Sequence, residues 1–282
     1  MVPDGMPGKT RLGRLILRPF MSRKPALLKD RFACRYHLPS YAEPIAQHIF
    51  TFGVYEPDTI KVILRLLPEN GTFIDVGANL GAIAIPIARA RPRATLLCIE
   101  ADPEIYQLLQ VNISDNCPGH VSTSHCIVGP REEEQVAFYR APDEKFGMGS
   151  IAPQFHENPI KLKQRSLDGI LKESGINCVD VIKMDVEGAE LGVLQGAKRL
   201  LFSNLPPAII FEFGDWAEAR VAGQRPGDAQ ALLFRHGYRL FRLGRDGALG
   251  EEFFAPMREG SSMLVALAPK NLASNSAGLT RD

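Results

Sequence analysis

Short apolar runs alternate with helix-like segments through most of the chain. Runs of strand length fall at residues 72–77, 94–100, 178–185 and 206–213, and further strands are predicted at 120–128, 134–139, 238–243 and 262–268. Segments with apolar residues at helical spacing lie at 57–67, 79–91, 103–116, 187–201 and 227–236. Strands alternating with helices of this length predict an α/β fold, with a mostly parallel sheet covered by helices on both faces.

The composition is that of an ordinary globular protein. The 282 residues carry 33 Lys and Arg against 32 Asp and Glu, and a net charge of +1 gives no general attraction to nucleic acid. No stretch of about 18 residues is both apolar and uncharged, which argues against a transmembrane segment. The five cysteines are scattered, so neither a disulfide framework nor a zinc site is indicated, and a cytoplasmic location is expected.

The two ends of the chain differ from its middle. Residues 1–50 hold nine Lys and Arg but three acids, and form a basic N-terminal extension in which Leu12, Leu15 and Ile16 lie between arginines. Both a peripheral membrane contact and an extension laid on the domain fit this pattern. Residues 271–282 are small and polar and are expected to form a flexible tail. Residues 51–270 then make up one domain.

Polar residues follow the first two strands of the domain. Asp75, Gly77 and Gly81 lie in DVGANLG, a spacing that lacks the GxGxxG cradle for a pyrophosphate. Glu100 ends the second strand, where an acid can accept hydrogen bonds from a ribose diol. Together these features favour a cofactor that has a nucleoside but no pyrophosphate. S-adenosylmethionine meets both demands.

Three stretches of sequence are typical of one family. They are GTFIDVGANLGAIAI at 71–85, IEADPE at 99–104 and VDVIKMDVEGAELGVLQGAKRLL at 179–201. On these stretches the chain resembles the FkbM-type family of S-adenosylmethionine-dependent methyltransferases, in the class I Rossmann-like group. The resemblance implies a doubly wound, mostly parallel, seven-stranded sheet. It also implies O-methylation of a sugar, glycolipid or polyketide-type natural product.

The resemblance also implies which residues bind the cofactor. The methionine end would be lined by Asp75, Gly77, Ala78, Asn79 and Gly81. The ribose hydroxyls would bind Glu100, and Glu56 would reach the amino group. Ala101 is included on the adenine side, although the family often has Glu-Pro where this chain has Glu-Ala-Asp-Pro, which can shift the contact there.

The reacting methyl group is expected over the end of the strand at 178–185. The protein must align the acceptor with the S–CH3 axis and remove a proton from it. For a hydroxyl acceptor, a carboxylate at this position can act as the base. Asp185 is the first candidate and Glu212, at the end of the strand at 206–213, is the second. Lys183 could pair with Asp185.

Acidic residues near this strand end raise the question of a metal. Asp185, Glu187, Glu190 and Glu212 could hold a divalent cation through hard oxygen ligands. None of the six histidines shows ligand spacing, and no metal is assigned.

The acceptor is expected to be a small hydroxylated molecule. Residues 140–160, which are rich in Gly and Pro, are expected to form a loop that could cover the substrate. A nicotinamide-dependent oxidoreductase is disfavoured by the missing GxGxxG and Tyr-x3-Lys patterns. A non-catalytic nucleoside-binding protein is disfavoured by the presence of Glu100 and Asp185. Both alternatives stay open until cofactor binding is measured.

Overall fold

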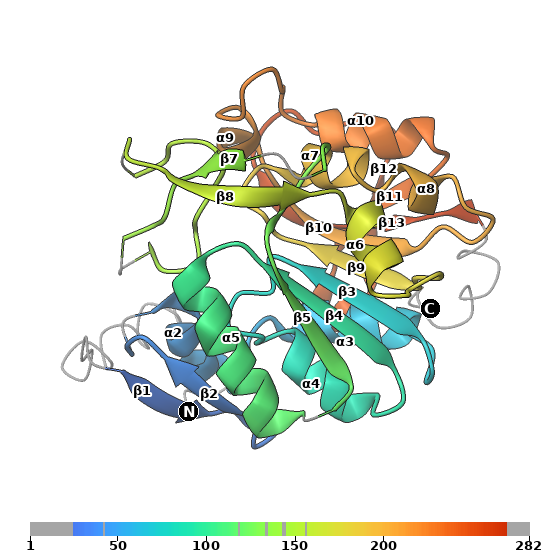
Figure 1. Cartoon of the computed structure of the whole chain (residues 1–282). Coiled ribbons are helices and arrows are strands. Elements are labelled where there is room, and N and C mark those ends of the chain that lie inside the picture. The colour runs from blue at the N-terminus through green and yellow to red at the C-terminus, as the bar shows by residue number, and fades with distance from the viewer. Residues whose placement is uncertain are drawn as a thin grey trace.

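An eight-stranded sheet forms the centre of the molecule (Figure 1). The computed structural model describes residues 25–41, 43–117, 119–132, 135–142, 145–155 and 157–269. In spatial order the strands are β12 (Leu249–Phe253), β11 (Arg239–Leu243), β13 (Ser261–Leu267), β10 (Ala208–Gly214), β9 (Val181–Met184), β3 (Thr72–Val76), β4 (Thr95–Glu100) and β5 (Val121–His125). Neighbours from β10 to β5 are parallel, whereas β13, β11 and β12 pair antiparallel. The predicted doubly wound α/β sheet is confirmed, with β12 as an eighth strand at its edge.

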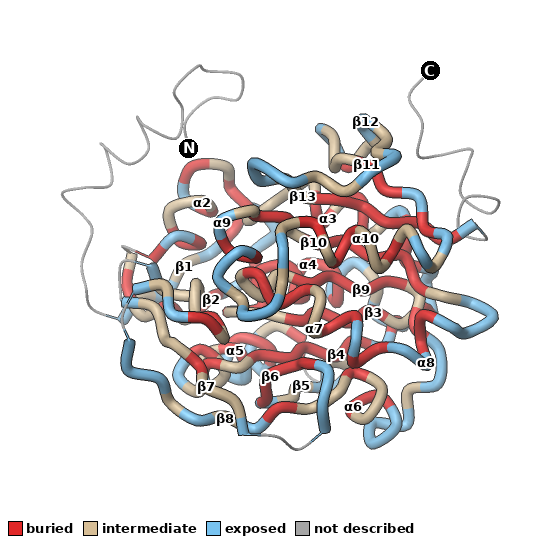
Figure 2. The backbone as a smooth tube through the Cα atoms, turned by 90° about the horizontal axis from the view of Figure 1, so that it is seen from above, coloured by how far each residue is buried: buried red, intermediate tan, exposed pale blue. Residues whose placement is uncertain are grey.

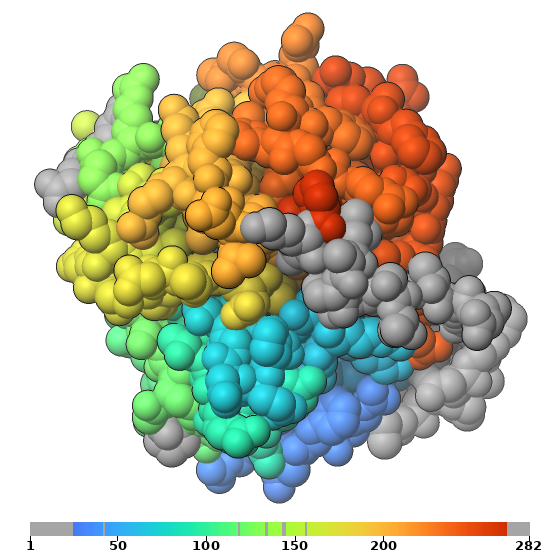
Figure 3. Space-filling model, turned by 90° about the vertical axis from the view of Figure 1, so that its right-hand side faces the viewer, coloured from blue at the N-terminus to red at the C-terminus, as the bar shows by residue number. Residues whose placement is uncertain are grey.

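Helices cover both faces of this sheet. One face carries α3 (Pro57–Leu66), α4 (Ala84–Ala90) and α5 (Pro103–Asn116). The other carries α6 (Leu167–Glu173), α7 (Glu190–Gln195), α8 (Lys198–Leu201) and α10 (Asp228–Arg235). Figure 3 shows this division at the surface, with the blue and cyan part of the chain below and the orange and red part above.

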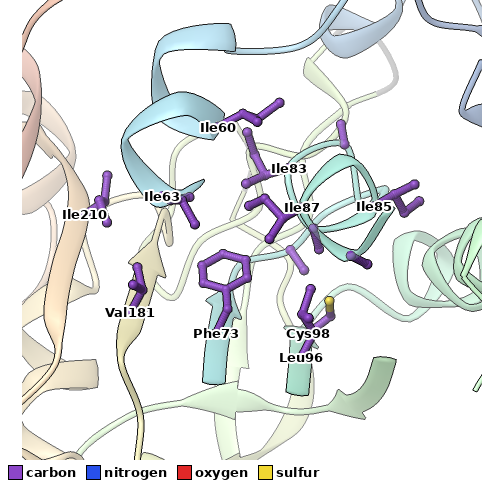
Figure 4. Packing of buried hydrophobic residues seen from close by; sticks show 14 of the residues in the cluster. Ile60, Ile63, Phe73, Ile83, Ile85, Ile87, Leu96, Cys98, Val181 and Ile210 are labelled. Atoms are coloured by element: carbon purple, nitrogen blue, oxygen red, sulfur yellow. The ribbon is translucent and has the colours of Figure 1, made fainter. Parts of the chain in front are cut away.

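Successive residues of each strand belong to different hydrophobic clusters. On β3, Phe73 packs with Ile63 of α3 and Ile87 of α4, as Figure 4 shows, whereas Ile74 belongs to the cluster on the other face. The strands β3, β4, β9 and β10 are therefore buried along most of their length (Figure 2). Burial on both faces explains why these strands are continuous apolar runs in the sequence.

The order of the strands reverses beside β3. From β3 the chain proceeds outward through β4 to β5, and it later places β9 and β10 on the opposite side of β3. Such a reversal leaves a crevice outside the carboxyl ends of the strands, where ligands bind in open α/β sheets.

Several predicted elements are divided or shortened. The strand predicted at 120–128 is split into β5 and β6 (Ile127–Val128), and β6 belongs to a small sheet of order β6-β8-β7 with β7 (Gln135–Phe138) and β8 (Ile160–Arg165). The helix predicted at 187–201 is interrupted between α7 and α8. A Cβ at Gly196 would lie 2.2 Å from the carbonyl oxygen of Gly129, so the small sheet contacts the backbone at this interruption.

The described part of the N-terminal region is folded onto the domain. It forms β1 (Ala26–Lys29), β2 (Arg35–Leu38) and α2 (Pro44–Phe52), whose apolar residues join the core cluster of α3 and α4. The Asn112 side chain on α5 accepts from the His37 N–H at 2.6 Å and donates to the His37 carbonyl at 3.2 Å, and Asn116 does the same with Arg35. The basic pattern around Leu12 and the predicted tail at 271–282 lie outside the described residues. Over the described ranges, none of the helices has the length and apolarity that crossing a membrane requires.

Candidate functional site

Charged side chains converge on one face of the sheet at its carboxyl edge. Asp75 of β3 is paired in register with Lys183 of β9, and Lys183 with Ile210 of β10. Since strand side chains alternate between faces, Asp185 and Glu212, each two residues farther along, follow on the same face. Glu100 of β4 follows Cys98, the register partner of Asp75, in the same way.

A cavity of about 260 Å³ opens above this row of charged residues. Of the residues that the sequence assigns to the site, those lining the cavity are Glu56, Gly77, Asn79, Glu100, Ala101, Asp185 and Glu212. Asp75, Ala78 and Gly81 are buried but are not among the lining residues. The loops after β3, β4, β9 and β10, which are far apart in the sequence, therefore line one cavity.

Gly77 permits the close contact between the first of these loops and the residue that follows β9. Its φ is 74°, and a Cβ there would lie 2.0 Å from the carbonyl oxygen of Asp185. The N–H groups of Gly77 and Ala78 donate to the Ile99 carbonyl at 2.9 and 3.0 Å, which ties the turn to β4. Gly81 has a different role, because a Cβ there would press on Ile85 and Leu109 of the covering helices.

The Glu100 carboxylate is held by the backbone. Its Oε2 accepts the N–H of Asn79 at 2.9 Å, and its Oε1 accepts the N–H groups of Ala101 and Asp102, both at 2.8 Å. Burial raises the pKa of Glu100 to about 7, while these donors oppose the rise. The carboxylate is fixed at the cavity wall with lone pairs left for a ligand.

Asp75 and Lys183 form a buried ionic group beneath the cavity. The Asp75 side chain is fully buried, and Lys183 Nζ lies 3.4 Å from its Oδ1, 3.5 Å from Asp185 Oδ2 and 3.1 Å from the Gly77 carbonyl oxygen. Burial acts to lower the pKa of Lys183, but the negative charges of Asp75 and Asp185 raise it above its ordinary value. The suggested pairing of Lys183 with Asp185 is confirmed. Lys183 does not reach solvent and instead holds the two aspartates in place.

Asp185 and Glu212 stand side by side at the end of the cavity. Burial, followed by the charges of Asp185, Glu187 and Glu190, raises the pKa of Glu212 to about 9. At neutral pH the Glu212 carboxyl therefore keeps its proton. Of the two candidate bases, Asp185 is the one whose charge is compensated by Lys183.

Three acids here could bind a cation. One carboxylate oxygen from each of Asp185, Glu187 and Glu212 lies within 4.8 Å of the others, close enough for all three to bind one cation. Glu190, the fourth acid of the sequence cluster, is directed elsewhere: its Oε1 accepts the N–H of Val186 at 3.1 Å.

Glu56 closes the same end of the cavity. It stands before α3 with a φ of 37°, a strained conformation for a residue with a side chain, and its Oε2 accepts a hydrogen bond from the Thr59 hydroxyl at 3.0 Å. Burial, and then the charge of Asp185, raises the pKa of Glu56.

Two segments line the cavity without having been assigned to the site from sequence. Residues 126–128, where β5 passes into β6, form part of the wall, as do residues 146–151 of the loop expected to cover the substrate. Ser150 anchors that loop, because its hydroxyl donates to the Glu187 carbonyl at 3.0 Å. At Gly147, where φ is 93°, a Cβ would lie 2.2 Å from Asn79 Nδ2. The glycines of this loop were the signal that its backbone approaches other side chains closely.

Comparison with known proteins gives one family. A family model described as the Methyltransferase FkbM domain matches residues 75–240. The 2-O-methyltransferase NoeI of Sinorhizobium fredii is 30% identical over 172 residues, which cover 54% of this chain and 70% of NoeI. The AMB antimetabolite synthetase AmbE of Pseudomonas aeruginosa is 25% identical over 232 residues, which cover 70% of this chain but 11% of AmbE.

Among solved structures, that of precorrin-6y C5,15-methyltransferase from Geobacter metallireducens aligns with a TM-score of 0.45 and 12% identity, over 76% of this chain and 88% of its own.

Proposed function

Because this chain belongs to the FkbM methyltransferase family, we propose that it transfers a methyl group from S-adenosylmethionine to a hydroxyl group. The acceptor would be a small molecule such as a sugar, a glycolipid or a polyketide-type compound. The name of NoeI, a 2-O-methyltransferase, is in keeping with transfer to oxygen. The observation that carries the proposal is the Glu100 carboxylate, fixed by three backbone N–H groups in a cavity that ends at Asp185 and Glu212.

The residues present fit this cofactor. Glu100 offers oriented lone pairs to a ribose diol. The buried Asn79 Oδ1 lines the cavity without a hydrogen-bond partner, and so could accept a hydrogen bond from the amino group of the methionine end. Residues 126–128 give an apolar wall on the side of Ala101 that suits a purine ring.

The chain's own groups then act on the acceptor. S-adenosylmethionine, when bound, supplies a methyl group on a sulfonium that leaves as a neutral thioether. Asp185 accepts the proton of the acceptor hydroxyl as that oxygen attacks. The protonated Glu212 donates a hydrogen bond beside it, and Lys183 keeps the Asp185 carboxylate in position.

Titration calorimetry tests the cofactor assignment. We expect micromolar binding of S-adenosylmethionine and S-adenosylhomocysteine and none of NADH. Binding of NADH instead would favour an oxidoreductase, and binding of none would favour a protein without this catalytic activity.

Glu100→Ala should weaken the binding of S-adenosylhomocysteine by about 1.5–3 kcal/mol, roughly 10- to 150-fold in Kd, because hydrogen bonds to a charged acceptor are lost. Calorimetry measures the affinity, and circular dichroism checks the fold. Glu259→Ala, at an exposed position outside the cavity, is the control and should bind as the wild type does. An unchanged Kd in Glu100→Ala would remove the ribose assignment.

Chelation should leave methyl transfer unchanged. The Lys183 ammonium lies 3.5 Å from Asp185 Oδ2 and already compensates the charge of that carboxylate, which reduces the net charge that the three-acid cluster offers to a cation. Initial rates are compared before and after dialysis against EDTA. A loss of rate that Mg²⁺ or Mn²⁺ restores would instead make Asp185, Glu187 and Glu212 metal ligands.

A further inference from the structure

A second hollow adjoins the cavity at its acidic end. It has a volume of about 400 Å³ and lies between α2, the beginning of α3, the end of β11 and the beginning of β13. Glu56 and Glu212 line both spaces, so the groove begins where the cavity ends. A molecule in the groove would reach the cavity at Glu56 and Glu212, and Glu212 lies beside Asp185.

We propose that this groove binds the methyl acceptor, and that the acceptor is an uncharged, polyhydroxylated ring compound. The inference rests on the proposed function, since it takes the cavity at Glu100 as the place of the cofactor. It adds the location of the acceptor and its charge, neither of which follows from belonging to the family.

Among the described residues, the lining of the groove carries acids and hydroxyl groups but no Lys or Arg side chain. Carboxyl groups come from Glu56, Asp58 and Glu212, and hydroxyl groups come from Ser261 and Ser262. The guanidinium group of Arg242 donates to the Ser262 hydroxyl at 2.8 Å, and its charge is compensated by a Glu251 carboxylate oxygen at 3.5 Å. A carboxylate-bearing acceptor would thus face acids without a counter-charge, which opposes its binding.

Protonated acids suit a neutral acceptor better than a cationic one. Burial raises the pKa of Glu56 and of Glu212, which favours the neutral carboxyl form that can donate a hydrogen bond as well as accept one. Ring hydroxyls need both kinds of partner. Leu243 and Met263 add apolar surface for the C–H face of a ring.

His48 lines the groove with an imidazole ring that its neighbours hold in place. Its Nδ1 lies 3.2 Å from the Val54 carbonyl oxygen, and because a carbonyl only accepts, Nδ1 carries the proton. Burial lowers the pKa of His48, which keeps the ring neutral and leaves a lone pair on Nε2. Phe52 and Tyr55 hold the ring, with centroids at 4.6 and 5.2 Å.

The first test fills the groove from a position that does not line the cofactor cavity. Ser261 is exposed at the start of β13, and Ser261→Trp should leave the Kd of S-adenosylhomocysteine unchanged. Ser122→Trp, at an exposed position on β5 at the far edge of the sheet, is the matched control. The probes are methyl glucoside, methyl rhamnoside, methyl glucuronide and glucosamine.

Acceptor binding is read by saturation-transfer NMR on the protein loaded with S-adenosylhomocysteine, and transfer by incorporation of labelled methyl groups. The neutral glycosides should bind to the wild type and to Ser122→Trp. Their affinity for Ser261→Trp should be lower by about tenfold or more, because the tryptophan side chain occupies the place of the sugar ring. Equal binding in Ser261→Trp would overturn the location. A stronger signal from the glucuronide or glucosamine, or none from either neutral glycoside, would overturn the acceptor class.

A second variant changes charge instead of shape. Leu243→Lys places a cation in the groove and should raise binding of the glucuronide relative to the glucoside. An unchanged ratio would also contradict the proposed site. Failure of the proposed function is a different result, because the wild type would then not bind S-adenosylhomocysteine.

Discussion

Replacing Lys183 by methionine is expected to destabilise the folded protein by about 3–5 kcal/mol, because a buried charge loses its partner. The Asp75 side chain is fully buried, and neither of its oxygens has a well-formed hydrogen bond, so the ammonium 3.4 Å away is its main compensation. Urea unfolding at pH 8 measures the loss. Lys172→Met, at an exposed position on α6, is the control and should change stability by less than about 0.5 kcal/mol.

The loss caused by Lys183→Met should depend on pH. Burial already raises the pKa of Asp75 to about 6, and removal of the lysine raises it further. An acid whose pKa is raised in the folded state destabilises that state once it ionises, so the loss should be larger at pH 8 than at pH 5. Adding Asp75→Asn to Lys183→Met should restore part of the stability. A loss that is the same at both pH values would show that the charge of Asp75 is not its cause.

Asp185→Asn is expected to lower the turnover number by about 10²- to 10⁴-fold, since an amide cannot take the acceptor proton. The Kd of S-adenosylhomocysteine should change little, because the ribose contact at Glu100 is untouched. Initial rates with labelled S-adenosylmethionine and a neutral glycoside measure the effect, with calorimetry beside them.

Glu212→Gln separates the roles of the two acids. Its pKa of about 9 makes Glu212 a neutral hydrogen-bond donor at pH 7, and glutamine preserves both neutrality and donation. The turnover number of Glu212→Gln should therefore fall by about tenfold at most, which corresponds to the free energy of one hydrogen bond. If Glu212→Gln lowered the turnover number more than Asp185→Asn does, the roles of the two acids would be exchanged. If Asp185→Asn lowered cofactor affinity as much as turnover, Asp185 would not be the catalytic base.

The strands that could be predicted are those buried on both faces. The runs at 72–77 and 178–185 correspond to β3 and β9, since each lies between two covered faces and needs apolar residues throughout. β8 was not predicted. Its sequence IKLKQR alternates apolar and polar residues, the pattern of a strand in a half-exposed sheet, and that alternation was the available signal.

The break at Cys126 and the interruption at Gly196 could not be read from local sequence. In both cases the chain is locally consistent with continuing the element, and tertiary contacts end it. β6 pairs with β8 in the small sheet and so is separated from β5. At residue 196, the Gly129 carbonyl oxygen occupies the space that a side chain would need.

The sequence by itself determined that Glu100, Asp185 and Glu212 would share one edge of a parallel sheet. Each ends a strand, and parallel strands direct their ends to the same edge. Only the tertiary structure decided that Asp75 lies beneath the cavity with Lys183, because strand order and register bring β9 beside β3. It also formed the groove at His48 and Ser261, residues about 200 positions apart, since such long-range contacts follow from packing and leave no local pattern in the sequence.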